Sequence, residues 1–164
     1  MVNILVCCTG SVATIKLPEL LEQLQKLDCQ EGVKVKVVLT ENSRHFLPPL
    51  SSLGTDVLTD DDEWSTWQGR GDPVLHIELR KWADLCLVTP LSANSLAKLS
   101  HGLADNLMTS VLRAWDFSKP VAVAPSKNTM MWEHPATSQH LSVLSQWGYT
   151  VIPPVEKTLG NSDL

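Results

Sequence analysis

The stretch Leu85-Cys-Leu-Val-Thr-Pro-Leu-Ser-Ala-Asn-Ser-Leu-Ala-Lys98 decides the fold of this chain. It starts as an apolar run, is predicted to end as a strand at Pro90, and passes through small polar residues into a helical pattern. A helix that begins at Ser92, Ala93, Asn94 and Ser95 offers backbone N–H groups, a hydroxyl and an amide to an anion or a polar ring. Ligands of open α/β sheets bind beyond the carboxyl ends of the strands. We therefore expect this crossing from strand to helix to form the floor of a cofactor site.

Other strand patterns in the chain also end in polar residues. The apolar run 2–8 is followed by Thr9-Gly10-Ser11, the run 33–40 by Glu41-Asn42-Ser43, and the run 121–124 by Ser126-Lys127-Asn128. Strand and helix patterns alternate through most of the chain, which predicts a doubly wound parallel sheet with helices on both faces. Because the carboxyl ends of such strands meet at one edge, the polar residues are expected to converge on a pocket.

Length and composition restrict the class of protein. The 164 residues, 43% hydrophobic and 19% charged, predict one globular domain over 1–164. The net charge of −5, with no basic cluster, argues against nucleic acid or an anionic membrane as partner. No apolar run approaches the roughly 20 residues that span a bilayer, and the strand pattern at the N-terminus leaves no room for a cleaved signal. Cys7 and Cys8 are adjacent and no C-x-x-C pair occurs, so we expect reduced thiols in a cytoplasmic protein.

A histidine near a predicted helix start is a candidate base. Asp72 and Pro73 are typical of an N-cap and a first helical position, which puts His76 in the first turn. The positive end of the helix dipole favours a neutral imidazole there, although a structural histidine is the alternative. The acidic run 60–63 is interpreted as a solvated helix start rather than a metal site. The remaining histidines lack metal-ligand spacing, so no metal is expected.

Further signals mark helix ends and a possible cofactor contact. Pro18 is expected to kink the first helix or to mark its true start, and Asp105 to cap a helix over 105–115. Pro135 and Gly148 predict a helix that ends at Trp147, followed by a last strand over 149–152. Phe46 could cover a flat cofactor or pack in the core.

Several segments together resemble the phosphopantothenoylcysteine decarboxylase family, which are homo-oligomeric flavin-containing cysteine decarboxylases. The segments that carry this resemblance are Gly10-Ser-Val-Ala13, Asp72-Pro-Val-Leu-His-Ile-Glu-Leu-Arg-Lys-Trp-Ala-Asp84, Pro90-Leu-Ser-Ala-Asn-Ser95, Asp105-Asn-Leu107, Arg113-Ala-Trp-Asp116 and Pro125-Ser-Lys-Asn-Thr-Met-Met-Trp132. The resemblance covers about residues 2 to 157. It implies a flavodoxin-like (Rossmannoid) three-layer sandwich of the α/β class and a homotrimer that binds FMN between subunits.

The resemblance also implies a role for individual residues. His76 matches the family's catalytic histidine, Asn128 the asparagine that binds the substrate carboxylate, and Met131 the methionine of the same loop. The residues that the resemblance assigns to FMN are Gly10, Ser11, Val12, Thr40, Glu41, Asn42, Phe46, Ser92, Ala93, Asn94, Ser95 and Ser126.

The implied reaction converts phosphopantothenoylcysteine to phosphopantetheine in coenzyme A biosynthesis. The cysteinyl side chain is oxidised to a thioaldehyde with the flavin as electron acceptor, CO2 leaves to give an ene-thiol, and the reduced flavin returns the electrons. A base beside the thiol and an amide on the carboxylate suit the first steps.

Two departures from the family pattern bear on activity. The family's loop usually reads P-A-M-N, whereas this chain has Pro125-Ser126-Lys127-Asn128. The family also has a proton-donating cysteine in a Gly-rich flap after the last strand, and the stretch 157–161 that follows here contains none. This predicts either a truncated sequence or an enzyme impaired in the final reduction. The alternatives are a flavin-binding regulatory or hetero-oligomer subunit, and a peptide decarboxylase that forms ene-thiols, against which the match over 72–84 argues.

Overall fold

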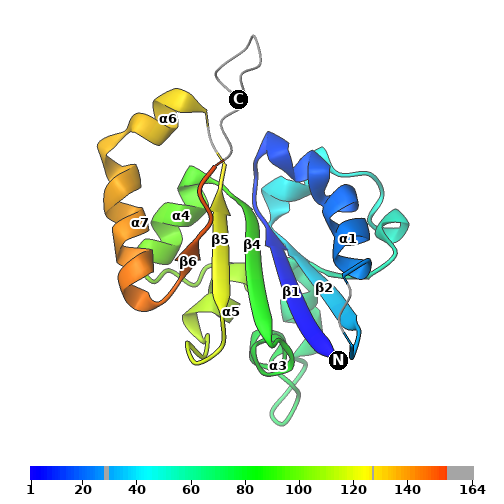
Figure 1. The fold of residues 1–164 in the computed structure, drawn as a ribbon. Helices are drawn as coiled ribbons and strands as arrows, with labels where there is room; N and C mark the ends of the chain where they lie inside the picture. Colours follow the sequence, from blue (N-terminus) through cyan, green and yellow to red (C-terminus); the bar gives the residue numbers. More distant parts are fainter. Residues whose placement is uncertain (28–29, 127, 155–164) are drawn as a thin grey trace.

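The computed structural model describes residues 1–27, 30–126 and 128–154, which build one six-stranded sheet. The strand order is β3-β2-β1-β4-β5-β6, and every neighbouring pair is parallel (Figure 1). The bounds are β1 Val2–Cys8, β2 Val33–Leu39, β3 Asp56–Leu58, β4 Leu85–Leu91, β5 Val121–Pro125 and β6 Thr150–Val151. The predicted doubly wound parallel sheet is confirmed. Its order reverses between β1 and β4, the position where such sheets open a crevice for ligands.

Apart from Asn3 near its start, the central strand β1 is apolar because helices cover both of its faces. Alternate β1 side chains enter two separate cores, so the adjacent Cys7 and Cys8 lie on opposite faces, as expected of neighbours on a strand. Burial raises the pKa of the Cys8 thiol well above its ordinary value. Cys7, Cys8 and Cys86 are free thiols, and Cys29 lies outside the described residues.

The two cores are filled by different helices. On one face, α1 (Leu17–Gln25) and the short 3₁₀ helix η3 (Leu50–Leu53) pack on the sheet. The other face is covered by α3 (Leu75–Trp82), α4 (Ala93–Ser100), α5 (Leu107–Arg113) and α7 (Pro135–Trp147). The remaining elements, which connect strands to helices, are η1 (Val12–Lys16), η2 (Glu41–Phe46), α2 (Asp60–Thr66) and α6 (Thr129–Glu133). No helix among the described residues is long and apolar enough to cross a membrane.

Most predicted helix signals are confirmed. α7 begins at Pro135 and ends at Trp147, with Gly148 in the left-handed region at φ 106°. Pro18 marks the true start of α1, after a 3₁₀ turn that Ser11 caps. The acidic run opens α2, where Thr59 and Asp62 form a capping box.

Two predicted N-caps, Asp72 and Asp105, are wrong because their carboxylates bind other groups. Asp72 accepts hydrogen bonds from the N–H groups of Gln68 and Gly69, at 2.8 and 3.0 Å, so α3 begins only at Leu75. His76 remains in the first turn. Asp105 pairs with Lys98, and the neighbouring Asn106 caps α5 instead.

Two strand ends also differ from the prediction. β4 does not stop at Pro90, which follows a cis peptide bond, but continues to Leu91. The Pro90 carbonyl is held by the backbone N–H and the hydroxyl of Thr9, so the chain stays bonded to its neighbour although proline has no N–H of its own. The last strand is limited to Thr150 and Val151.

Candidate functional site

A cavity of about 380 Å³ lies at the carboxyl ends of β1, β2 and β4. It contains residues from all three strand ends, from η2 and α6, and from the starts of α2, α4 and α5. Its lining consists of Gly10, Thr40, Glu41, Asn42, Asp60, Ser92, Ala93, Asn94, Ser95, Lys98, Asp105, Asn106 and Met131. The structure thus brings together nine of the fifteen residues that the sequence assigned to the site.

The loops after β1 and β4 are joined by Thr9, which is fully buried. Its hydroxyl donates to the Pro90 carbonyl at 2.8 Å and accepts from the Ser92 N–H at 2.7 Å. Ser92 then caps α4, where its hydroxyl accepts from the Ser95 N–H at 3.2 Å. The N–H groups of Ala93 and Asn94 lie in the first turn, where the helix itself supplies no acceptor. This wall of the cavity is therefore a set of fixed hydrogen-bond donors.

The loop after β1 approaches the segment after β2 at backbone distance. A Cβ atom added at Gly10 would lie 2.7 Å from the Cβ of Asn42, so only glycine fits there. The next residue, Ser11, places its hydroxyl 3.5 Å from that of Ser126, which follows β5. The predicted convergence of four polar strand ends is present, with Ser11 and Ser126 just outside the lining.

Thr40 is the best indicator that this cavity takes a ligand. Thr40 is buried and lines the cavity. Among the described residues, its Oγ1 is the one buried side-chain nitrogen or oxygen atom without a hydrogen-bond partner. Such an unmade hydrogen bond destabilises a protein by about 1–3 kcal/mol unless a ligand supplies the partner. A hydroxyl, an amide and helix N–H groups around one space suit the polar edge and the phosphate of FMN, so the residues present fit that cofactor.

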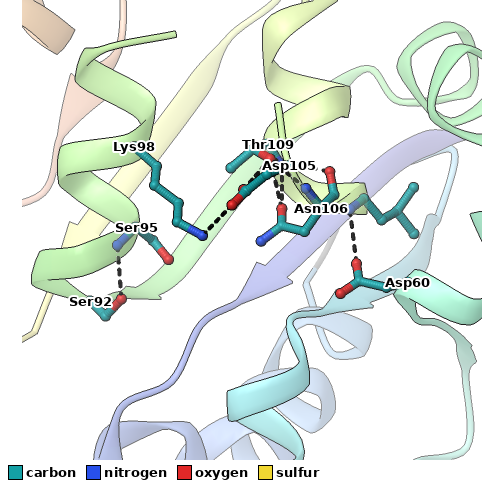
Figure 2. Close-up of polar contacts among 8 residues, drawn as sticks. Asp60, Ser92, Ser95, Lys98, Asp105, Asn106 and Thr109 are labelled. Atoms are coloured by element: carbon teal, nitrogen blue, oxygen red, sulfur yellow. Dashed lines mark hydrogen bonds and ion pairs between the residues drawn. The ribbon is translucent and has the colours of Figure 1, made fainter. Parts of the chain in front are cut away.

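Four lining residues were not predicted as site residues, and Figure 2 shows how they are held. Lys98 donates to Asp105 at 2.8 Å, and this hydrogen bond holds the pKa of Asp105 below its ordinary value. Asp60 accepts from the Leu107 N–H at 2.9 Å, and Asn106 caps α5 through the Thr109 N–H (Figure 2). Asp60 comes from a distant element, so no local sequence signal places it here. The pair of Lys98 and Asp105, seven residues apart, depends on the turn between α4 and α5.

The substrate-binding candidates lie on α6. The Oδ1 of Asn128 accepts from the Met131 N–H at 3.0 Å, which fixes the side chain as the N-cap of α6. Met131 lines the cavity although it is half exposed. Lys127, whose effect the sequence left open, lies outside the described residues, as does the 157–161 stretch.

Besides Ser11, Ser126 and Asn128, three other predicted residues lie outside the cavity lining. Val12 is 53% exposed on η1, and Phe46 ends η2 with its ring edge-on to that of His45. His76 lies on α3, where its Nδ1 is 2.5 Å from an oxygen of Glu63 on α2. Glu63 is a further residue that the sequence reasoning did not identify, because the contact joins two helices through a loop of eight residues.

Comparisons with known proteins agree with this geometry. The Flavoprotein family profile matches residues 1–163. A phosphopantothenoylcysteine decarboxylase from mouse is 51% identical over 157 residues, which cover 96% of this chain and 75% of the mouse protein. One from rice is 48% identical over 162 residues, which cover 98% of this chain and 71% of the rice protein.

Two solved structures are similar over the whole fold. The FMN binding protein AtHal3 matches with a TM-score of 0.89 and 47% identity, covering 99% of this chain and 85% of that one. A cysteine-to-serine mutant of a PPC decarboxylase, complexed with pantothenoylaminoethenethiol, matches with a TM-score of 0.88 and 46% identity, covering 99% and 87%. The flavodoxin-like fold expected from the sequence is confirmed by these neighbours.

Proposed function

The chain belongs to the Flavoprotein family, and from this membership we propose that it is an FMN-dependent phosphopantothenoylcysteine decarboxylase of coenzyme A biosynthesis. The observation that carries the proposal is the cavity at the strand ends, where the Thr40 hydroxyl has no partner among the described residues, in a chain 48–51% identical to decarboxylases of that name. FMN is the cofactor that a relative of the same fold is named for binding.

The lining residues would hold FMN through groups that are already oriented. Thr40, Asn42 and the first turn of α4 supply the hydroxyl, amide and N–H groups, and Gly10 keeps the loops close together. When bound, the flavin supplies a reversible sink for an electron pair, which allows a carboxylate next to a saturated carbon to leave as CO2.

Two side chains would act on the substrate itself. The Oδ1 of Asn128 is engaged in the α6 cap, so its Nδ2 N–H groups are the part that would donate to the substrate carboxylate. The His76 imidazole would accept the proton of the substrate thiol. These roles account for the presence of an amide and a base in a site that removes CO2 from a cysteinyl group.

The position of His76 supports a site that is shared between subunits. His76 is absent from the lining of the cavity, whereas Met131, three residues after Asn128, is part of it. We therefore propose a homotrimer in which FMN lies at the subunit interface and His76 of the partner subunit completes the site. A cytoplasmic location is proposed as well, and the free thiols of Cys7, Cys8 and Cys86 support it.

The identity of the product tests the proposal. The purified chain, loaded with FMN, is incubated with phosphopantothenoylcysteine and the products are identified by mass spectrometry. Release of CO2 together with phosphopantetheine or its ene-thiol is expected. A yellow, FMN-loaded protein that leaves the substrate intact would contradict the enzyme and would favour the regulatory or hetero-oligomer subunit.

The same experiment reports on the last step. The printed sequence has no cysteine after Cys86, and the relative crystallised with an ene-thiol compound carries a cysteine-to-serine change. We expect a polypeptide of residues 1–164 to accumulate the ene-thiol, which contains two hydrogen atoms fewer than the final thiol. Phosphopantetheine formed at an undiminished rate would show that another group donates the proton.

A further inference from the structure

Glu63 binds His76 with both of its carboxylate oxygens. Oε1 contacts the ring nitrogen Nδ1, and Oε2 accepts a hydrogen bond from the His76 backbone N–H at 3.1 Å. The side chains are 13% and 26% exposed, so water competes little for this contact. Val74, the N-cap of α3, has no side-chain acceptor for the first turn, and Glu63 supplies one for the His76 N–H.

The neighbouring acidic residues of α2 are engaged elsewhere. Asp60 accepts from the N–H of Leu107, and Asp62 forms the capping box with Thr59. Asp61 is exposed. Of the acidic residues of α2, Glu63 is thus the one whose carboxylate binds His76 on α3.

This contact determines which nitrogen of His76 is available. An ionised carboxylate only accepts hydrogen bonds, so the Nδ1 facing it must carry a proton in both charge states of the ring. The neutral imidazole then has its lone pair on Nε2, on the side away from Glu63. In Ser-His-Asp triads, a buried carboxylate selects the tautomer in this way, and its replacement by an amide lowers kcat by about 10⁴.

We propose that Glu63 is a positioning residue for the decarboxylation: it orients the His76 ring and keeps the proton on Nδ1, so that Nε2 exchanges the proton with the substrate thiol. This inference rests on the proposed function.

The variant Glu63→Gln tests this role with almost no change in shape. An amide has one acceptor atom, so it cannot serve both His76 donors, and its NH₂ group favours the wrong tautomer when it faces Nδ1. Because general acid–base catalysis contributes about 10²–10⁴-fold, we expect kcat for CO2 release to fall about 10²-fold, with KM and FMN absorbance unchanged. Glu78→Gln is the matched control, since Glu78 is exposed on the same helix and should leave kcat unchanged.

A double variant separates positioning from general stabilisation. If Glu63 acts through the imidazole, Glu63→Gln should reduce kcat no further in a His76→Asn background. Losses that multiply in the double variant would overturn the proposal, and so would wild-type kcat in Glu63→Gln.

Nitrogen NMR of histidine-labelled protein gives a readout that needs no turnover. The wild-type His76 signal is expected to show a protonated Nδ1 and an unprotonated Nε2 above the titration of the ring, and Glu63→Gln is expected to add the other tautomer. Identical tautomers in both proteins would refute the role of Glu63. A wild-type protein with the expected tautomer but without CO2 release would refute the proposed function instead.

Discussion

At Thr40, the stability of the flavin-free protein and the binding of a ligand have opposite requirements. Its buried Oγ1 lacks a partner among the described residues, so Thr40→Val removes an unsatisfied polar atom. We expect the flavin-free protein to become more stable by about 1 kcal/mol. FMN should bind about tenfold more weakly if the hydroxyl is its partner, as proposed. Urea unfolding and flavin titration measure the two effects.

Thr14 provides the matched control for this substitution. It is also buried, but its hydroxyl donates to the Thr9 carbonyl at 2.8 Å, so Thr14→Val should destabilise the flavin-free protein by about 1 kcal/mol. Equal losses of stability in the two variants would mean that the Thr40 hydroxyl already has a partner in the empty protein.

The two functions assigned to Asn128 can be separated by one substitution. Asn128→Asp keeps an acceptor for the Met131 N–H, and hence the α6 cap, but replaces the two amide donors with a negative charge. We expect unchanged FMN binding and thermal stability, with kcat/KM lowered by about 10² or more because the substrate carboxylate is repelled. Asn128→Ala, which also removes the cap, should in addition lower the melting temperature.

Single residues were predictable from sequence where their role is local. Gly10 and Ser92 follow strands and obey turn and capping chemistry, so their place in the site could be inferred without a structure. Glu63 and Asp60 could not be identified, because their partners His76 and Leu107 are 13 and 47 residues away. From the local sequence, the acidic run 60–63 is best interpreted as a solvated helix start, which gives no indication of these distant contacts.

At the scale of elements, α3 carries His76 and is held at its far end by Lys119. The Lys119 Nζ donates to the carbonyls of Arg80, Lys81 and Ala83 at 3.1, 3.3 and 2.8 Å. These are carbonyls at the helix end, which have no partner within the helix. A cation there also interacts favourably with the negative end of the helix dipole.

Lys119→Met should therefore weaken the attachment of the C-terminal end of α3 and destabilise the protein. It keeps the apolar stem but leaves the carbonyls without their donor, and we expect the free energy of unfolding to fall by about 1–2 kcal/mol in urea titrations. The control is Lys26→Met on α1, where the ion pair with Glu22 is largely exposed and the change should stay within about 0.5 kcal/mol. Equal effects of the two substitutions would contradict a specific role for Lys119.

Helix ends were predictable only where the capping residue has no competing partner. Pro135 and Gly148 bound α7 as expected, because their own backbone preferences favour a first helical position and a left-handed helix end. Asp72 and Asp105 are of a residue type that favours the N-cap. Asp72, however, accepts from backbone N–H groups of the preceding turn, and Asp105 pairs with Lys98. The periodic patterns thus predicted which elements exist, whereas their first residues depended on side-chain partners elsewhere in the chain.

At the scale of the whole molecule, a shared site predicts complementation between two defective chains. His76→Asn and Asn128→Asp should each lower the rate of CO2 release about 10²-fold or more when expressed alone. In mixed trimers formed by co-expression, about a quarter of the sites would combine an intact Asn128 with an intact histidine of the partner subunit. We expect CO2 release at about that fraction of the wild-type rate. No recovery of activity in the mixture, with trimers verified by sedimentation, would place both residues in the same chain's site.

The short edge strands of the sheet restrict how copies of this chain can associate. Among the described residues, β3 contributes three residues and β6 two at the margins of the sheet. Margins this short expose few unpaired peptide groups, and they therefore give a neighbouring molecule little template for main-chain pairing. Copies of this chain should therefore associate through side-chain contacts, without forming new β-sheet hydrogen bonds between molecules. The infrared amide bands of the associated and dissociated protein should then be the same.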